Sequence, residues 1–151
     1  MQTNTAPEQI RPLYAVDETK KKAIKKAYID NNGYKIGDRF YLLDNIPKKK
    51  RDNVIAKYVK INTDEEFIAL YDDTIFGNAK VGFVITPNYL YFNNTDHITG
   101  LIPISCIDGI DYVDSDLLIM SGDFHTRIDM VVADDKETFA RVLDDIVKIL
   151  K

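Results

Sequence analysis

The feature that most constrains this chain is a succession of about seven short strand patterns in residues 66–151, followed by one amphipathic helix. Each pattern alternates apolar and polar residues or is rich in aromatic residues, and short turn signals separate the patterns. The expected strands cover residues 67–72, 81–86, 89–93, 101–104, 107–113, 117–120 and 128–132, with a loop at 121–126. Pro103 lies in the fourth strand. Proline lacks the backbone N–H that a central strand needs, so this strand is expected at a sheet edge or a bulge.

The helix after these strands has a continuous apolar stripe. Its apolar residues recur at the spacing of one helix face, at Phe139, Val142, Leu143, Ile146, Val147 and Leu150. Asp134, followed three residues later by Glu137, is an aspartate form of the capping box and predicts where the helix begins. Burying each large residue of the stripe contributes roughly 1.5–3 kcal/mol. The helix is therefore expected to close the open end of a curved antiparallel sheet.

The strand number, the strand order and the terminal helix together resemble the pleckstrin-homology-like (PH-like) superfold, including its GRAM-like and bacterial PH-like branches. Residues 72–86 resemble the first hairpin of short bacterial PH-like proteins, with the pattern D-D-T-x-F-G-x-x-K-x-G-F-x-x-T before a strand that ends in Tyr91 and Phe92. Residues 100–104 and 107–110 resemble later strands of that group. The resemblance implies an α+β fold, a strongly bent antiparallel sheet or barrel of about seven strands capped by a C-terminal helix. Its motifs are structural and imply a fold more than a function.

The chain changes character near residue 60. Residues 1–13 are predicted to be disordered, residues 14–60 to form a basic helical extension packed on the domain, and residues 61–151 to form the PH-like domain. Within the extension we expect helices at 17–30 and 47–60 and a short extended piece at 36–46.

The second predicted helix of the extension begins at Pro47, because proline suits the first turn of a helix. It carries an apolar stripe of Val54, Ile55, Tyr58 and Val59. This stripe predicts that the helix docks on the sheet.

Composition narrows the class of protein. At 151 residues and 45% hydrophobic residues, the chain is large enough to bury a core. A single cysteine excludes an internal disulfide and favours a reducing compartment. No apolar run approaches the ~20 residues of a membrane span, and residues 1–8 lack the pattern of a signal peptide. These features predict a cytoplasmic protein.

Charge is unevenly distributed along the chain. Residues 1–60 hold 14 Lys+Arg against 7 Asp+Glu (net +7), and residues 61–151 hold 6 against 17 (net −11), which sum to −4. Either the basic segment lies against the acidic domain, or it binds an external anionic partner. The basic clusters are dominated by lysine, few aromatic residues are interleaved and the whole chain is acidic. Nucleic acid is therefore not the expected partner.

The candidate partner-binding residues form two groups of opposite charge. The basic group comprises Lys48, Lys49, Lys50, Arg51 and, in the first hairpin loop, Lys80. The acidic group comprises Asp108, Asp111, Asp114 and Asp116. The acidic spacing departs from the EF-hand pattern, which favours turn and strand-face positions over metal ligands. In the hairpin loop Lys80 stands alone near Asp72 and Asp73, so inositol phosphate recognition is weakly supported.

The sequence offers no enzyme chemistry. The two histidines, His97 and His125, fall in expected loops, and no serine stands in a nucleophile elbow. Cys106 lies in an apolar run and is expected to be a buried, inert thiol. In the hairpin motif, Asp73 and Thr74 are expected to cap turn amides and Phe76 to anchor the loop. We expect neither a cofactor nor a metal.

These features predict a cytoplasmic, non-enzymatic PH-like binding module whose partner is another protein. One alternative is a small immunity protein that neutralises a basic toxin, because acidic faces can mask cationic active sites. The other is a domain that binds anionic lipid at a membrane surface through its lysine helices. The identity of the partner and the oligomeric state stay open.

Overall fold

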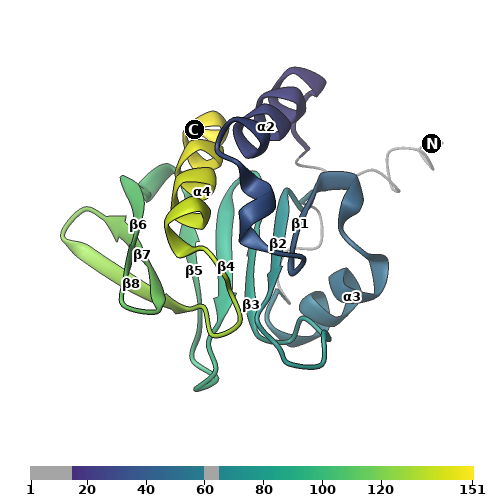
Figure 1. Cartoon of the computed structure of the whole chain (residues 1–151), viewed down its shortest axis with the longest axis vertical. Coiled ribbons are helices and arrows are strands. Elements are labelled where there is room, and N and C mark those ends of the chain that lie inside the picture. Colours follow the sequence, from purple (N-terminus) through teal and green to yellow (C-terminus); the bar gives the residue numbers. More distant parts are fainter. Residues whose placement is uncertain (1–14, 60–64) are drawn as a thin grey trace, which may run out of the picture.

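The computed structural model describes residues 15–59 and 65–151 (Figure 1). The predicted disordered segment, residues 1–13, lies outside the described residues. The helices are α2 (Glu18–Asp30), α3 (Lys48–Lys57) and α4 (Lys136–Leu150), with short 3-10 turns η1 (Gly33–Ile36), η2 (Leu43–Asn45) and η3 (Ile104–Cys106). The strands are β1 (Phe40–Leu42), β2 (Ala69–Asp72), β3 (Gly82–Ile85), β4 (Tyr89–Asn93), β5 (Thr99–Pro103), β6 (Gly109–Val113), β7 (Asp116–Ser121) and β8 (Phe124–Asp129).

The strands form two antiparallel sheets and no closed barrel. One sheet has the order β1-β2-β3-β4-β5 and the other the order β6-β7-β8. The α+β class and the C-terminal helix are confirmed. The described strands do not close into a barrel, and the PH-like form, one strongly bent sheet or barrel of about seven strands, stays a prediction. Pro103 ends β5 at the edge of the larger sheet, as its missing N–H predicts. The chain then turns through η3, and β6 pairs with β7 instead of with β5.

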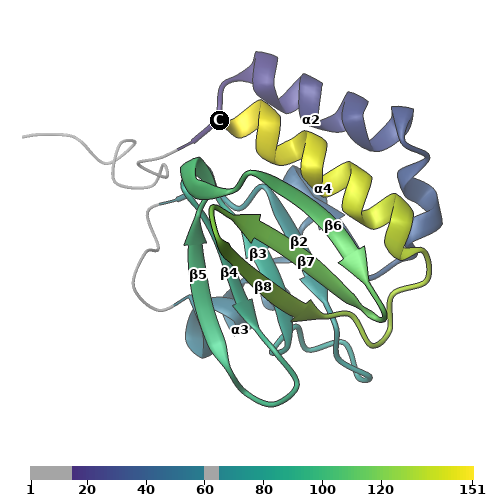
Figure 2. The ribbon, with the colours of Figure 1, turned by 90° about the vertical axis from the view of Figure 1, so that its left-hand side faces the viewer.

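Both faces of the larger sheet are covered. On one face, α4 and the β6–β8 sheet enclose a large core together with Ile24 of α2 (Figure 2). On the other face, Val54 of α3 packs with Leu70 and Val84. Neighbouring residues of one strand therefore point into different cores, and every position of β2 and β3 is buried.

The helix α4 seals the larger core, and its predicted stripe is confirmed. All six apolar residues of the stripe are buried. The Phe139 ring lies 4.9 Å from that of Phe40, 5.0 Å from that of Tyr71 and 5.7 Å from that of Phe83, measured between ring centroids. These contacts join α4 to β1, β2 and β3 at one point.

The predicted cap of α4 is displaced by one residue. The carboxylate of Asp135, not that of Asp134, accepts the backbone N–H of Thr138, and the helix begins at Lys136. Two adjacent aspartates both precede the stripe. The capping-box spacing predicted Asp134 as the cap, whereas Asp135 makes the hydrogen bond.

The N-terminal segment contributes to both cores. Asp17 caps α2 by accepting the backbone N–H of Lys20 at 2.8 Å, and α2 lies beside α4 (Figure 2). The strand β1, in the predicted extended piece, pairs with β2 and lengthens the sheet. The helix α3 begins at Lys48, one residue after the predicted start at Pro47, and ends at Lys57. The domain boundary placed at residue 60 stays a prediction, and the described residues on both sides of it share the two cores.

Two local predictions are wrong. The loop expected at residues 121–126 is a short turn at Gly122, whose φ of 60° suits glycine, and β8 already begins at Phe124. Cys106 is exposed, because Ile104 and Ile107 on either side of it take the buried positions. None of the helices in the described ranges has the length and apolarity needed to cross a bilayer.

Candidate functional site

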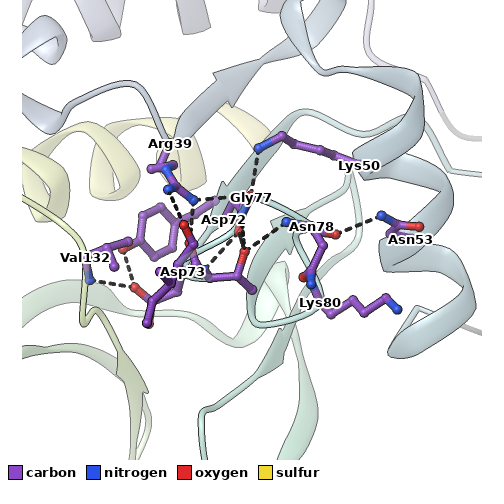
Figure 3. A network of polar contacts seen from close by, with 12 residues as sticks. Arg39, Lys50, Asn53, Asp72, Asp73, Gly77, Asn78, Lys80 and Val132 are labelled. Carbon is purple, nitrogen blue, oxygen red and sulfur yellow. Dashed lines mark hydrogen bonds and ion pairs between the residues drawn. The ribbon is translucent and has the colours of Figure 1, made fainter.

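The loop between β2 and β3 is organised around a buried carboxylate, that of Asp72 (Figure 3). Lys50 of α3 places Nζ 2.7 Å from Oδ2, and an Arg39 guanidinium nitrogen lies 3.7 Å from the same oxygen. The other oxygen accepts the backbone N–H of Thr74 at 2.9 Å and its hydroxyl at 2.5 Å. Two cations and two hydrogen-bond donors thus converge on one side chain.

These contacts keep the Asp72 carboxylate ionised. Burial alone raises the pKa of a carboxyl group, but the hydrogen bonds from Lys50 and Thr74 outweigh burial and hold the pKa of Asp72 below its usual value. Burial opposes the charge of Lys50 as well, yet the hydrogen bond to Asp72 raises the pKa of that ammonium group. The pair is therefore charged on both sides at neutral pH.

The backbone of the loop is tied down from both ends. The Thr74 hydroxyl oxygen accepts the backbone N–H groups of Gly77 and Asn78, each at 3.0 Å. Arg39 donates to the carbonyl oxygen of Thr74 and, at 3.0 Å, to that of Ile75. Asn53 of α3 donates to the carbonyl oxygen of Asn78 at 3.0 Å. The loop is thus held by its own first residues, by α3 and by the residue before β1.

Asp73 connects this loop to the second sheet. Its carboxylate accepts the Tyr71 hydroxyl at 2.6 Å and the backbone N–H groups of Val131 and Val132 at 3.0 and 2.9 Å. Burial and the neighbouring Asp73 raise the pKa of Tyr71. Asp73 and Thr74 were both predicted to cap amides of the turn. The prediction is confirmed for Thr74, which accepts the backbone N–H groups of Gly77 and Asn78. Asp73 instead caps amides after β8, almost sixty residues further along the chain.

The tip of the loop presents two large apolar side chains to solvent. Ile75 is 75% exposed and Phe76 is 93% exposed. The prediction that Phe76 anchors the loop is wrong, because the polar contacts of Asp72 and Thr74 and the buried methyl group of Ala79 take that role. The site is a loop held by several hydrogen bonds, with polar contacts directed inward and an apolar tip directed outward.

The structure divides the predicted basic group. Lys50 is committed to Asp72 and lies 4.9 Å from the centroid of the Tyr41 ring, and Lys48 pairs with Asp52 of its own helix at 2.9 Å.

The remaining basic residues have different surroundings. Arg51 lies over the Phe67 ring at 4.9 Å, whereas Lys49 and Lys80 are exposed and have no ion pair within the described ranges. The five residues therefore do not form one cationic site.

The predicted acidic group lies on the β6–β8 sheet and is used largely within it. Asp114 and Asp116 both contact Arg127, at 3.3 and 3.0 Å. Asp108 accepts the backbone N–H of Gly122 at 2.6 Å, and Asp111 accepts that of Tyr112 at 2.8 Å. These contacts stabilise turns and strand ends of the sheet.

Sequence patterns missed Arg39 and Asn53 as parts of the loop network, since each contacts residues at least 25 positions away. The exposed Ile75 was also missed. A signal for it was present, because it neighbours Phe76 in a segment with turn-forming residues on both sides.

Comparisons of the chain with protein-family models, with curated proteins and with solved structures found no match. Within the described residues, no three His, Cys, Asp or Glu side chains are grouped as metal ligands. We therefore infer function from the side-chain geometry of the loop and its surroundings.

Proposed function

We propose that this chain is a non-enzymatic, PH-like binding module whose partner is another protein, which it contacts through Ile75 and Phe76. The exposure of these two adjacent side chains on a fixed loop carries the proposal. The PH-like part of the proposal is supported by the order of β2–β5, β6–β8 and α4, which is four strands, three strands and a helix. The strand β1 is an addition to that order.

Exposed apolar residues are common singly on protein surfaces, but an adjacent pair on a rigid loop suits a binding anchor. Such anchors dominate the energetics of many interfaces. The loop is already held by Arg39, Asn53 and Thr74. Binding through it therefore costs little ordering entropy, which favours affinity.

The charges near the loop favour a protein over a phosphate group. Lys50 is committed to the buried Asp72 carboxylate. Arg39 contacts the same carboxylate and donates to two backbone carbonyl oxygens of the loop, so both cations are already engaged within the protein. Lys80 is the exposed cation of the loop itself. An anionic membrane is the second candidate partner, because an exposed aromatic residue and an exposed lysine on one loop, Phe76 and Lys80, also suit insertion at a lipid surface. The immunity function and the cytoplasmic location stay predictions.

The test compares an Ile75→Ser/Phe76→Ser variant with Phe124→Ser, which alters another exposed aromatic side chain, on β8. Each protein is used to capture partners from the source cell, and a captured protein is purified and titrated against all three chains. We expect binding that the loop variant weakens at least about tenfold and that Phe124→Ser leaves unchanged.

Flotation with vesicles of neutral and anionic phospholipid provides the second arm. We expect none of the three chains to float. Flotation of the wild type that the loop variant abolishes would replace the protein partner by a membrane. Equal binding of a purified partner by wild type and loop variant would remove Ile75 and Phe76 from the interface.

A further inference from the structure

The strand β1 has an outer edge that pairs with no other strand among residues 15–59 and 65–151. It is the terminal strand of the larger sheet and pairs with β2 alone. The carbonyl oxygen of Arg39 accepts the backbone N–H of Asp72 at 2.9 Å, and the backbone N–H of Leu43 donates to Ile68 at 3.0 Å. Because backbone direction alternates along a strand, residues 39, 41 and 43 face β2, and residues 40 and 42 direct their N–H and C=O groups outward. A row of hydrogen-bonding groups is therefore available at this edge.

A pocket of about 310 Å³ follows the same edge. It is lined by Phe40, Tyr41 and Leu42 of β1 and by Lys25, Tyr28 and Ile29 of α2. Successive side chains of a strand point to opposite faces. A pocket that touches all three residues of β1 therefore lies along the backbone edge and not on one face of the sheet.

The α2 side of the pocket has two chemical characters. Tyr28 stacks on Phe40 with 6.3 Å between ring centroids, and Ile29 is left 70% exposed beside it. Lys25 is exposed at the same pocket and has no ion pair among the described residues. The pocket thus combines an apolar wall, an unmatched cation and a row of backbone donors and acceptors.

We propose that an extended segment of a partner protein adds to β1 as a further strand, with a large apolar side chain against Tyr28 and Ile29 and an acidic side chain at Lys25. Strand addition satisfies the outward groups of Phe40 and Leu42, and the pocket supplies selectivity for alternate side chains. Its volume is at the lower end of the roughly 300–1,000 Å³ of small-molecule sites, which suits one anchoring side chain.

The charge of α2 favours a different protein, and not a second copy of this chain, as the source of the added strand. The helix α2 carries Lys20, Lys21, Lys22, Lys25 and Lys26 against Glu18 and Asp30, which is five positive and two negative charges, a net charge of +3. Symmetric pairing of two β1 edges would bring two such helices close together, and their like charges would repel. An acidic segment meets the same surface with complementary charge. This surface is separate from Ile75 and Phe76, so the inference does not depend on the function proposed for them.

The experiment selects random heptapeptides on the full chain and measures the affinity of the enriched sequences as synthetic peptides. We expect enrichment of sequences that contain an acidic residue and a large apolar residue at alternate positions, so that both side chains lie on the same side of the added strand. Ile29→Asp should weaken their binding at least about tenfold, and Lys25→Glu should weaken it markedly. Lys22→Glu changes the charge of the same helix outside the pocket and should leave the affinity close to that of the wild type.

Backbone pairing has its own readout. On peptide addition, the amide proton resonances of Phe40 and Leu42 should shift in NMR spectra, whereas that of Tyr41, already bonded to β2, should move little. N-methylation of the peptide amides that face β1 should abolish binding. Failure to enrich any peptide, equal binding by Ile29→Asp, or indifference to N-methylation would overturn the proposal. So would self-association in sedimentation that Ile29→Asp abolishes, which would make a second copy the occupant.

Discussion

The Nζ atom of Lys50 lies 2.7 Å from the Oδ2 atom of Asp72, so a side chain of α3 neutralises a carboxylate that has no exposed surface at the end of β2. This ion pair joins the helix on one face of the sheet to the loop that presents Ile75 and Phe76. The stability of the fold and the geometry of the candidate site are therefore coupled through one contact.

Replacing Lys50 by Met should lower the free energy of unfolding by about 3 kcal/mol, because the buried carboxylate loses its nearest cation. This is the lower end of the usual range for a broken buried pair, since Arg39 and Thr74 still contact Asp72. Chemical denaturation measures the loss. Lys49→Met is the matched control on the exposed side of the same helix and should change stability by less than about 0.5 kcal/mol. Similar losses in both variants would contradict a structural role for the pair.

The same pair predicts a pH dependence. The folded-state pKa of Asp72 is below its ordinary value of 3.8, so the unfolded chain binds more protons in acid. The stability contributed by Asp72 is fully present above about pH 5 and is lost as the pH falls through the lower folded-state pKa. In denaturation at a series of pH values, Asp72→Asn should be less stable than wild type at pH 7, and the gap should narrow below about pH 4.

Asp135 provides an internal control for this measurement. The hydrogen bond from the backbone N–H of Thr138 lowers the pKa of Asp135 as well. Asp135 is present in both wild type and Asp72→Asn, so its contribution cancels in the stability difference between the two proteins. A gap of constant size from pH 7 to pH 3 would show that Asp72 does not carry the acid sensitivity.

Truncating Leu143 to Ala should cost about 2–5 kcal/mol, because this side chain of α4 is fully buried and its removal leaves a cavity in the larger core. Val131→Ala, at a position that is 66% exposed, is the control and should stay within about 0.5 kcal/mol of wild type. Thermal or chemical denaturation distinguishes the two. A loss below 0.5 kcal/mol for Leu143→Ala would be incompatible with the burial of the α4 stripe.

The lysines of the predicted basic group should not bind phosphate-bearing surfaces. Lys48 is matched by Asp52 and Lys50 by Asp72, which leaves Lys49 and Lys80 as scattered cations. We expect no detectable binding of wild type to anionic vesicles or mixed RNA across a salt series. Binding that weakens steeply with salt through counterion release, and that Lys49→Ala/Lys80→Ala abolishes, would mean that the partner class is wrong.

Regular periodicity made much of the fold predictable. The stripe from Phe139 to Leu150 and the opposite orientations of Phe83 and Val84 follow from local spacing, and both are seen in the structure. The addition of β1 to the larger sheet and the division of the strands into two sheets were not predictable in this way. The first depends on β1 pairing with β2 across a separation of about thirty residues, and the second depends on the turn at η3 between β5 and β6; neither leaves a periodic signal.

The candidate site was predicted only in part. The motif around Asp72 and Thr74 marked the right loop, because these residue types bond to nearby amides. The network also needs Arg39 and Lys50, which come from distant parts of the chain and were assigned from sequence to other roles or to none. Phe76 points outward because hydrogen bonds hold Asp72 and Thr74 on the inner side of the loop. The residue types in the motif do not by themselves predict which side chains take the inner side.

The place of α4 in the chain has a consequence for synthesis on the ribosome. Its stripe closes a core that also holds Ile24, Phe40 and Phe83, residues made much earlier. Until residues 136–150 have left the exit tunnel, one face of the larger sheet lacks its cover, and a nascent chain with such a face is prone to aggregate. A pause in translation that keeps this helix inside the tunnel should therefore increase the dependence of the nascent chain on chaperones.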